Sequence, residues 1–176
     1  MKSLLLVVAL LQLSACSSQK YVSMPLSLAT VTENDVEVSI QLENNSVGGY
    51  LLSATFTPMD GFHMYSKDIP PSGVNGLGRP TLIELSGESQ MTPLGGLIES
   101  VHAEVPDFEP RELLVYPPGT VTLSLPVELP QGNDWVDENV KITYMSCSET
   151  GCKPPVVGKL IPVRVPGAGV LLDQGK

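Results

Sequence analysis

The sequence predicts an all-β protein, built as an antiparallel β-sandwich of about seven or more strands. Short segments alternate apolar and polar residues with a period of two, which is typical of half-buried strands. Turn-forming residues separate these segments, and the chain of 176 residues contains 16 Gly and 16 Pro. After the first 15 residues, no window of eleven or more residues shows a sustained helical period.

The predicted strands follow one another along the chain, with turns or loops between them. They span residues 36–42, 50–57, 81–85, 121–125, 140–145 and 156–165, with a short aromatic segment at 61–65. The loops at 68–80 and 105–110 are too rich in Gly and Pro for a helix. We expect Pro126 at the edge of its strand, because proline cannot donate to a strand ladder.

The N-terminus has the layout of a secretory signal. Lys2 precedes an apolar run over residues 4–11 that is too short to span a bilayer. The run leads into Leu-Ser-Ala-Cys at residues 13–16, which resembles the bacterial lipobox, where the leader is cut before a Cys that becomes lipidated. We therefore expect a lipoprotein signal peptide at residues 1–15 and lipidation of Cys16. The alternative is a plain signal peptide with an incidental Cys.

The lipobox sets the expected organisation and location of the rest of the chain. Residues 16–29 are predicted to form a lipidated tether, residues 30–166 one β-sandwich domain, and residues 167–176 a frayed C-terminal tail. The protein is expected in the cell envelope, facing the periplasm and held to a membrane by its lipid. Since Ser17 rather than Asp follows the lipidated residue, an outer-membrane anchor is favoured in a cell with two membranes.

Composition excludes several classes of function. The net charge is −9 and no basic residues cluster, so a nucleic-acid partner is not expected. Export places the protein where disulfides persist and removes the cytosolic supply of ATP and NADH. We therefore expect no cofactor.

Two cysteines stand out in the C-terminal third. Cys147 and Cys152 are separated by Ser-Glu-Thr-Gly, a segment suited to a tight hairpin that would face the two Cβ atoms across the strand ends. As a structural staple, so short a loop would contribute only about 2 kcal/mol. A small disulfide near the surface is also easier to reduce than a buried one. The chemistry of the residues leaves a staple and a redox site equally open.

Metal binding and hydrolysis are the weaker alternatives. Cys147, Cys152, His63 and His102 are residue types that bind copper or zinc, but the chain has no His-x-His, Cys-x-x-Cys or Met-rich spacing. We therefore predict no metal ligands, although a metal-binding lipoprotein stays among the hypotheses. A Gly-x-Ser-x-Gly motif is also absent, which disfavours a hydrolase.

Three segments carry a recognisable set of motifs. Residues 60–69 read Asp-Gly-Phe-His-Met-Tyr-Ser-Lys-Asp-Ile, residues 123–127 read Leu-Ser-Leu-Pro-Val, and residues 140–155 contain Val-Lys-Ile-Thr-Tyr-x-x-Cys followed by Cys-x-Pro-Pro. Together, in this order and at these spacings, they resemble the N-terminal periplasmic domain of DsbD, a thiol:disulfide interchange protein. The resemblance extends over residues 30–165 and is carried by the combination rather than by any one motif.

The resemblance implies an immunoglobulin-like sandwich with a redox pair, Cys147 and Cys152, on a hairpin. It implies that His63 and Tyr65 line the site and that Asp107 and Phe108 belong to a cap loop that shields the disulfide. The alternative for each aromatic residue is ordinary core packing. The segment between the two cysteines is one residue shorter here than in the family.

The implied function is an electron relay by thiol–disulfide exchange. The partners would be a thioredoxin-like or membrane electron-donor protein on one side and oxidised envelope proteins on the other. Because the chain shows no membrane-spanning conduit and no thioredoxin-like module of its own, we expect a separate protein to supply electrons. The chain could thus be a protein-disulfide reductase component. The alternative is a non-catalytic immunoglobulin-like binding module whose hairpin disulfide is structural.

The neighbours of the cysteines suggest separate roles for the two thiols. We expect Cys152 to face the partner, because Gly151 before it has no side chain and Lys153 after it brings a positive charge that favours a thiolate. Cys147, at the end of a predicted strand, would then resolve the mixed disulfide. His63 would lower the pKa of the attacking thiol if it lay nearby and were protonated.

Overall fold

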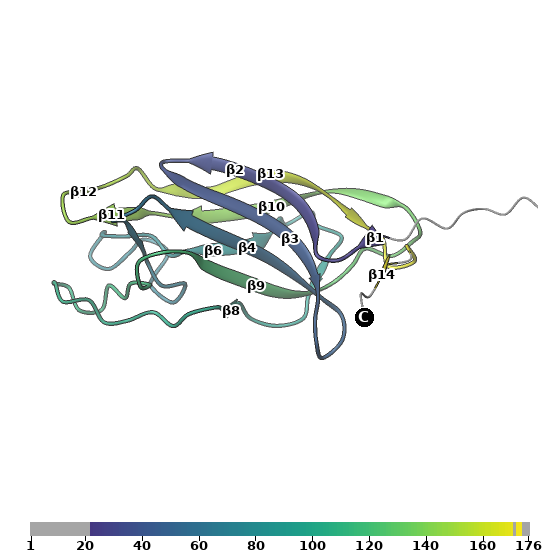
Figure 1. The fold of residues 1–176 in the computed structure, drawn as a ribbon, viewed down its shortest axis with the longest axis horizontal. Coiled ribbons are helices and arrows are strands. Elements are labelled where there is room, and N and C mark those ends of the chain that lie inside the picture. Colours follow the sequence, from purple (N-terminus) through teal and green to yellow (C-terminus); the bar gives the residue numbers. More distant parts are fainter. Residues whose placement is uncertain (1–21, 171, 174–176) are drawn as a thin grey trace, which may run out of the picture.

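The computed structural model describes residues 22–170 and 172–173, which form fourteen β-strands and no α-helix. Two antiparallel sheets lie face to face and form an elongated body (Figure 1). The all-β antiparallel sandwich predicted from the sequence is therefore confirmed. No helix long and apolar enough to cross a membrane occurs among the described residues.

The larger sheet contains six strands in the order β2-β3-β4-β9-β7, with β8 also paired to β9. Its strands are β2 (Leu26–Glu33), β3 (Val36–Asn44), β4 (Tyr50–Pro58), β9 (Val121–Glu128), β7 (Thr92–Pro93) and β8 (Ile98–Glu99). The second sheet has the order β13-β10-β6, formed by β13 (Val156–Pro166), β10 (Trp135–Tyr144) and β6 (Leu82–Leu85).

The strand order of the two sheets is immunoglobulin-like. In that fold one sheet has the strand order A-B-E-D and the other the order C-F-G. Strands β3, β4, β9 and β7 follow the first order, and β6, β10 and β13 follow the second, with β2 added beside β3. The architecture that the resemblance implied is thus present in the pairing of the strands.

Two small sheets lie at opposite ends of the sandwich (Figure 1). At one end, β12 (Gly151–Cys152), β11 (Ser146–Ser148) and β5 (His63–Met64) form a three-stranded antiparallel sheet. At the other end, β1 (Val22–Ser23) pairs in parallel with β14 (Leu172–Asp173). The chain therefore enters the sandwich at the end remote from the two cysteines.

The main core lies between the two large sheets, and alternation along the strands fills it. On β3 the residues at every second position, from Val36 to Leu42, are fully buried, while their neighbours are not. Across the core, the ring of Phe56 on β4 packs edge-on against Tyr144 on β10, with 5.7 Å between the ring centroids. This interdigitation of the inner faces fixes the register of both sheets.

A tight turn joins β2 to β3 beside the cysteine hairpin. Asn34 and Asp35 both have positive φ values, 51° and 59°, which is the backbone of a two-residue hairpin turn that favours Asn and Asp. The hydroxyl of Tyr144 donates a hydrogen bond of 3.0 Å to the carbonyl of Glu33. The turn is thereby fixed to β10, directly before the chain continues into β11.

The strand boundaries differ from the prediction at both ends of the domain. β2 begins at Leu26, so the sandwich includes the last four residues of the segment assigned to the tether. Residues 167–169, assigned to a frayed tail, donate backbone hydrogen bonds to the 130–134 loop. Cys16, the signal peptide at 1–15 and the start of the tether lie outside the described residues.

Within the domain, β9 continues through Pro126, which the sequence places at the edge of its strand. The carbonyl of Pro126 accepts a hydrogen bond from the backbone N–H of Leu94 on the side of the irregular β7. Since the nitrogen and carbonyl of a strand residue face the same side, the missing N–H costs no bond to β4. The proline is therefore compatible with a strand that has an irregular neighbour.

Candidate redox site

The cysteine hairpin is an extension of the longest hairpin of the second sheet. Tyr144 on β10 pairs with Val156 on β13, and beyond this pair the chain continues into β11 and returns through β12. Pro154 and Pro155 separate β12 from β13, and since neither has a backbone N–H, the ladder is interrupted there. The interruption allows the tip of the hairpin to leave the second sheet and pair with β5.

Cys147 and Cys152 face each other at the tip and form a disulfide, with 4.0 Å between the Cα atoms. Beyond them Ser148 pairs with Gly151, which leaves a two-residue loop. The hydroxyl of Ser148 donates to the carbonyl of Gly151 and accepts from the backbone N–H of Thr150. These local bonds close the hairpin independently of the sulfur atoms.

The three short strands place the site residues in one row. Cys147 on the central strand β11 pairs with Cys152 on one side and with His63 of β5 on the other. Directly paired residues project from the same face of a sheet, and so does Tyr65, two residues after His63. The structure therefore brings together four of the residues that the resemblance pointed to.

Tyr65 lies closest to the disulfide. Its hydroxyl donates a hydrogen bond of 2.9 Å to Sγ of Cys147 and lies 4.0 Å from Sγ of Cys152. The side chain is 4% exposed, and burial raises the pKa of its phenol. The neutral hydroxyl is thus the form at neutral pH, and it is a hydrogen-bond donor directed at one sulfur.

His63 lies beside Tyr65, with 5.4 Å between the two ring centroids in an edge-on arrangement. Burial lowers the pKa of the imidazole, and its Nε2 atom is buried without a hydrogen-bond partner among the described residues. The proximity that the sequence left open is therefore present. The imidazole is neutral at neutral pH, however, so it does not supply the positive charge expected to favour a thiolate.

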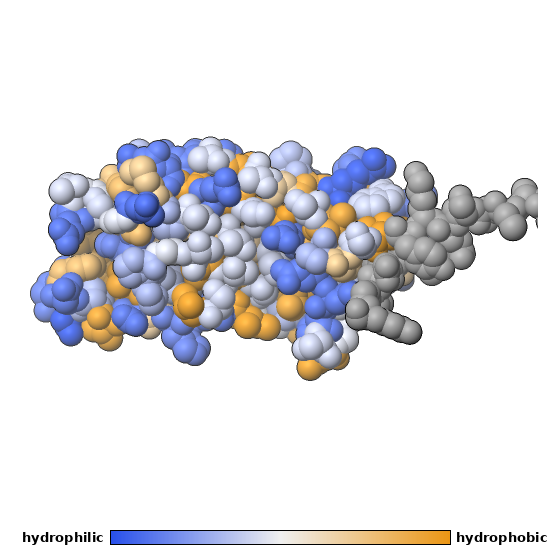
Figure 2. Space-filling view, in the orientation of Figure 1, coloured by the Kyte–Doolittle hydropathy of each residue, from blue (hydrophilic) through white to orange (hydrophobic). Residues whose placement is uncertain are grey.

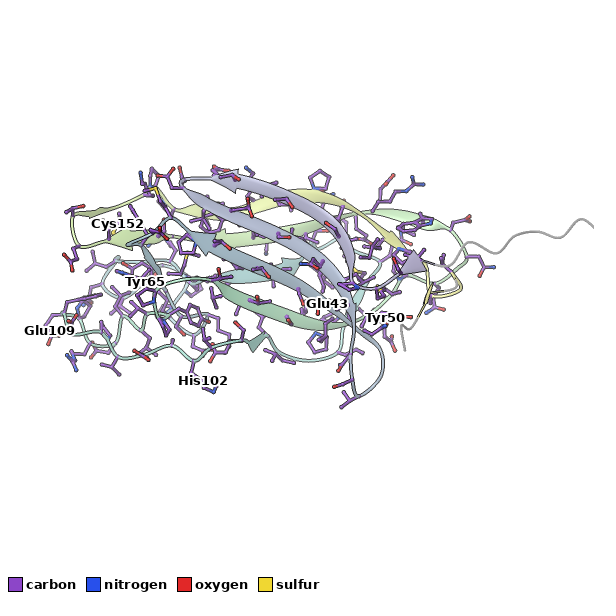
Figure 3. The ribbon with its side chains drawn as sticks, in the orientation of Figure 1. Glu43, Tyr50, Tyr65, His102, Glu109 and Cys152 are labelled. Atoms are coloured by element: carbon purple, nitrogen blue, oxygen red, sulfur yellow. A yellow bond between two sulfur atoms is a disulfide. The ribbon has the colours of Figure 1, made fainter. Side chains whose placement is uncertain are left out.

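Phe108 and Asp107 lie on the opposite wall of a cleft that contains the disulfide. The ring of Phe108 packs against His63 at 6.0 Å between centroids, and both residues line a cavity of about 910 Å³ that includes Cys147 and Cys152. Cys152 is nevertheless an exposed residue, so the loop does not cover this arm of the hairpin. Figure 3 shows Tyr65, Cys152 and Glu109 at the same end of the sandwich.

The two sulfurs differ sharply in their surroundings. Cys147 is 2% exposed and belongs to a small apolar cluster with Tyr65, Ile69 and Leu113. Cys152 is exposed on the edge strand β12. Of the two cysteines, Cys152 is therefore the one that faces solvent, whereas the cluster covers Cys147.

Lys153 does not direct its charge at the cysteines. Its ammonium pairs with Asp35 in the β2–β3 turn and lies 5.6 Å from the centre of the Phe62 ring. In the same turn, Nδ2 of Asn34 donates a hydrogen bond of 2.8 Å to the carbonyl of Pro154. Lys153 thus anchors the hairpin to the sandwich, and the role expected from its place in the sequence is not what the contacts show.

Several residues of the cleft had no signal in the sequence. Leu113, Met145 and Arg79 line it, and Arg79 donates to backbone carbonyls of the loop at residues 68–80. Gly78 lies so close to the ring of Tyr65 that a Cβ at this position would come within 3.3 Å of two ring carbons. Only the glycine content of that loop hinted at a close approach, and it did not say to which residue.

Metal ligands do not gather in the described part of the chain. Among residues 22–170 and 172–173, no three His, Cys, Asp or Glu side chains are grouped so as to hold a metal ion. His102 lies away from the cysteines, on the exposed side of the 101–118 segment, where its ring bonds to Glu99.

Comparisons with known proteins give one structural likeness. No family model and no curated protein matches the chain. Among solved structures, the chain is similar to the N-terminal domain of DsbD from Neisseria meningitidis in the reduced form, with a TM-score of 0.42 and 17% sequence identity. The match covers 81% of this chain and 86% of that chain. This is the same domain that the sequence motifs resemble.

Proposed function

We propose that the protein is a lipid-anchored, periplasm-facing thiol–disulfide exchange domain that works through Cys147 and Cys152. It would carry electrons between a thioredoxin-like or membrane reductase and disulfides of envelope proteins. The observation that carries the proposal is the unequal placement of the two sulfurs: Cys152 is exposed in a cleft, and Cys147 is 2% exposed behind it. A disulfide with one accessible sulfur suits exchange with a partner protein.

The exchange begins when a thiolate of a reduced dithiol partner attacks Sγ of Cys152. The bond between Cys147 and Cys152 breaks, Sγ of Cys147 leaves with the electron pair, and a mixed disulfide joins Cys152 to the partner. The partner's second thiolate then attacks the partner sulfur that is bonded to Cys152 in the mixed disulfide. The partner ends as a disulfide, Cys152 leaves as a thiolate, and the pair has gained two electrons.

The reduced pair can pass its electrons on by the same chemistry in reverse. The thiolate of Cys152 attacks a disulfide of an oxidised envelope protein and forms a new mixed disulfide. Cys147 then attacks Sγ of Cys152, which restores the original bond and releases the substrate with both of its sulfurs reduced. The exposed thiol therefore meets both partners, and the buried thiol acts only within the hairpin.

A structural disulfide is the competing function, and the contacts of the hairpin count against it. The hydroxyl of Ser148 closes the loop, and Asn34 and Lys153 hold the returning strand to the β2–β3 turn. The hairpin is thus held at several points without its sulfur bond. A staple in this position would add little.

The reduction potential of the pair tests the proposal. Equilibration in glutathione or dithiothreitol redox buffers, read by thiol alkylation and mass, should give a value above about −300 mV, the range of exchangeable rather than structural disulfides. The oxidised protein should also be reduced by a thioredoxin-like dithiol. A potential below that range, together with no exchange, would leave the staple as the function.

Trapping tests the assignment of the two thiols. Cys147→Ser keeps the exposed thiol and removes the resolving one, so it should accumulate mixed disulfides with a dithiol partner. Cys152→Ser retains only the buried thiol of Cys147, so it should accumulate few mixed disulfides. The reverse pattern would contradict the assignment, and equal trapping by both variants would show that burial does not separate the roles.

The proposed anchor can be tested separately. The lipid predicted on Cys16 would hold the end of the sandwich at which β1 lies, and the cysteine hairpin lies at the far end (Figure 1). In the space-filling view, apolar residues lie interspersed with hydrophilic ones on the face shown (Figure 2). We expect the wild type in the membrane fraction and Cys16→Ser in the soluble fraction. Wild type in the soluble fraction would contradict the anchor and leave the exchange proposal intact.

A further inference from the structure

The hydroxyl of Tyr65 distinguishes the two sulfur atoms of the disulfide. It donates to Sγ of Cys147 at 2.9 Å, whereas Sγ of Cys152 lies 4.0 Å away. The nearer sulfur is also the buried one. The sulfur of the buried Cys147 therefore has the closer donor, and the sulfur of the exposed Cys152 has the more distant one.

The position of this hydroxyl is held from several sides. The carbonyl of Tyr65 accepts hydrogen bonds from the backbone N–H of Thr81 at 3.3 Å and from its hydroxyl at 2.7 Å. The face of the ring lies on Gly78, where there is no room for a Cβ, and the ring of His63 packs against it at a right angle. The phenol is thus directed at Cys147 before any reaction begins.

The state of the phenol suits a donor. Because burial raises the pKa of Tyr65, the hydroxyl keeps its proton at neutral pH. Its two neighbours in the row are the neutral imidazole of His63 and the sulfurs themselves. A thiolate formed on Cys147 would therefore meet one oriented O–H group in surroundings that otherwise disfavour charge.

We propose that Tyr65 gives the disulfide its direction of opening, by hydrogen-bonding Sγ of Cys147 as that sulfur leaves. This role rests on the exchange function proposed above. The partner's thiolate bonds to Sγ of Cys152, the Cys147–Cys152 bond breaks, and the electron pair stays on Sγ of Cys147. The phenol stays protonated and shares its hydrogen with the new thiolate. Attack on Cys147 would instead place the charge on Sγ of Cys152, which lies farther from this donor, at 4.0 Å.

The pKa of the Cys147 thiol tests this role without a partner protein. In reduced Cys152→Ser, the thiolate of Cys147 is followed by its ultraviolet absorbance as the pH is raised, after subtraction of the Cys147→Ser/Cys152→Ser double variant, which cancels any signal from Cys16. Adding Tyr65→Phe should lower the thiolate fraction by about tenfold or more at a given pH below the transition, the size expected for one hydrogen bond to a charged group.

Tyr144→Phe is the matched control. It also removes one buried phenol hydroxyl, but that hydroxyl bonds to the carbonyl of Glu33 and not to sulfur. In the Cys152→Ser background it should leave the thiolate fraction unchanged. If Tyr65→Phe and Tyr144→Phe give the same fraction as the background alone, or shift it equally, the proposed role of Tyr65 is wrong.

A second measurement uses the intact disulfide, with both cysteines present. The oxidised protein is treated briefly with a monothiol such as glutathione, quenched with acid, and the adduct is mapped by mass spectrometry. The adduct should lie on Cys152, and in Tyr65→Phe it should form more slowly. An adduct mainly on Cys147 overturns the direction. A normal pKa effect of Tyr65 with no exchange toward any dithiol partner would instead refute the proposed function alone.

Discussion

The main core and the cluster around the cysteines are built in different ways. Strands of eight and nine residues, such as β9 and β3, enclose the main core, and alternation along them buries one face almost completely. The cysteine cluster rests on strands of two or three residues, such as β5 and β11, and on loops. Segments with few buried contacts are the ones that open most easily. The fold thus separates the part that supplies stability from the part that reacts.

The largest expected difference is in the free energy of unfolding that is lost when a side chain of either cluster is truncated. Phe56→Ala in the main core should lower the free energy of unfolding by about 3–5 kcal/mol, because no neighbour can fill the cavity. Leu113→Ala in the cysteine cluster should cost only about 2 kcal/mol, the low end for such a change, since the cluster borders an open cleft that can relax. Urea unfolding of the oxidised proteins measures both. Equal losses would show that the two clusters form one cooperative core.

Removing the disulfide should have a smaller effect. Chain entropy for so short a loop gives about 2 kcal/mol, so the Cys147→Ser/Cys152→Ser double variant should remain folded with the same β content. Circular dichroism and urea unfolding give the two readouts. Loss of the folded state in this variant would contradict the separation between stability and reactivity, and would favour a structural disulfide.

The ion pair that anchors the hairpin should contribute less still. Lys153→Met keeps the apolar stem near Phe62 and removes the charge paired with Asp35. We expect a loss below about 1 kcal/mol that diminishes at high salt. Arg164→Met is the control, because its pair with Asp137 is long, at 3.7 Å, and exposed. A larger loss for the control would mean that Lys153 does not anchor the hairpin through its charge.

The smallest expected effect is a dependence on pH through His63. Burial lowers its pKa in the folded protein, so below about pH 6.5 the unfolded chain takes up a proton that the folded chain does not. The free energy of unfolding should therefore fall as the pH drops from about 6.5 toward the lower pKa of the folded state. His63→Phe should reduce this slope. Urea midpoints of the wild type and the variant, measured between pH 7 and pH 5, make the comparison, and an unchanged slope would contradict the prediction.

Prediction from the sequence succeeded where a pattern is local. The alternation of β3 and β4 and the turn between them were evident, and so was the hairpin that carries the cysteines. It failed where a tertiary contact overrides the pattern. β10 begins at Trp135, before the predicted strand, and includes the buried Glu138, whose carboxylate accepts the backbone N–H of Gln90.

The site shows the same division. The motifs pointed to Cys147, Cys152, His63 and Tyr65, and the structure brings these four together. The expected charge effects were not found, because a sequence neighbour is not a spatial partner. Lys153 follows Cys152 in the chain, but the turn at Asp35 binds its ammonium, and His63 lies close but is neutral.

The class of fold, the hairpin and the pair of cysteines could be predicted from the sequence, because alternation, turn residues and spacing act over a few residues of chain. The unequal burial of Cys147 and Cys152, and the hydrogen bond from Tyr65 to the buried one, arise in the tertiary structure. Those features depend on loops far apart in the chain that meet at one end of the sandwich. Burial, exposure and hydrogen-bond direction arise where those loops pack together, so no local pattern encodes them.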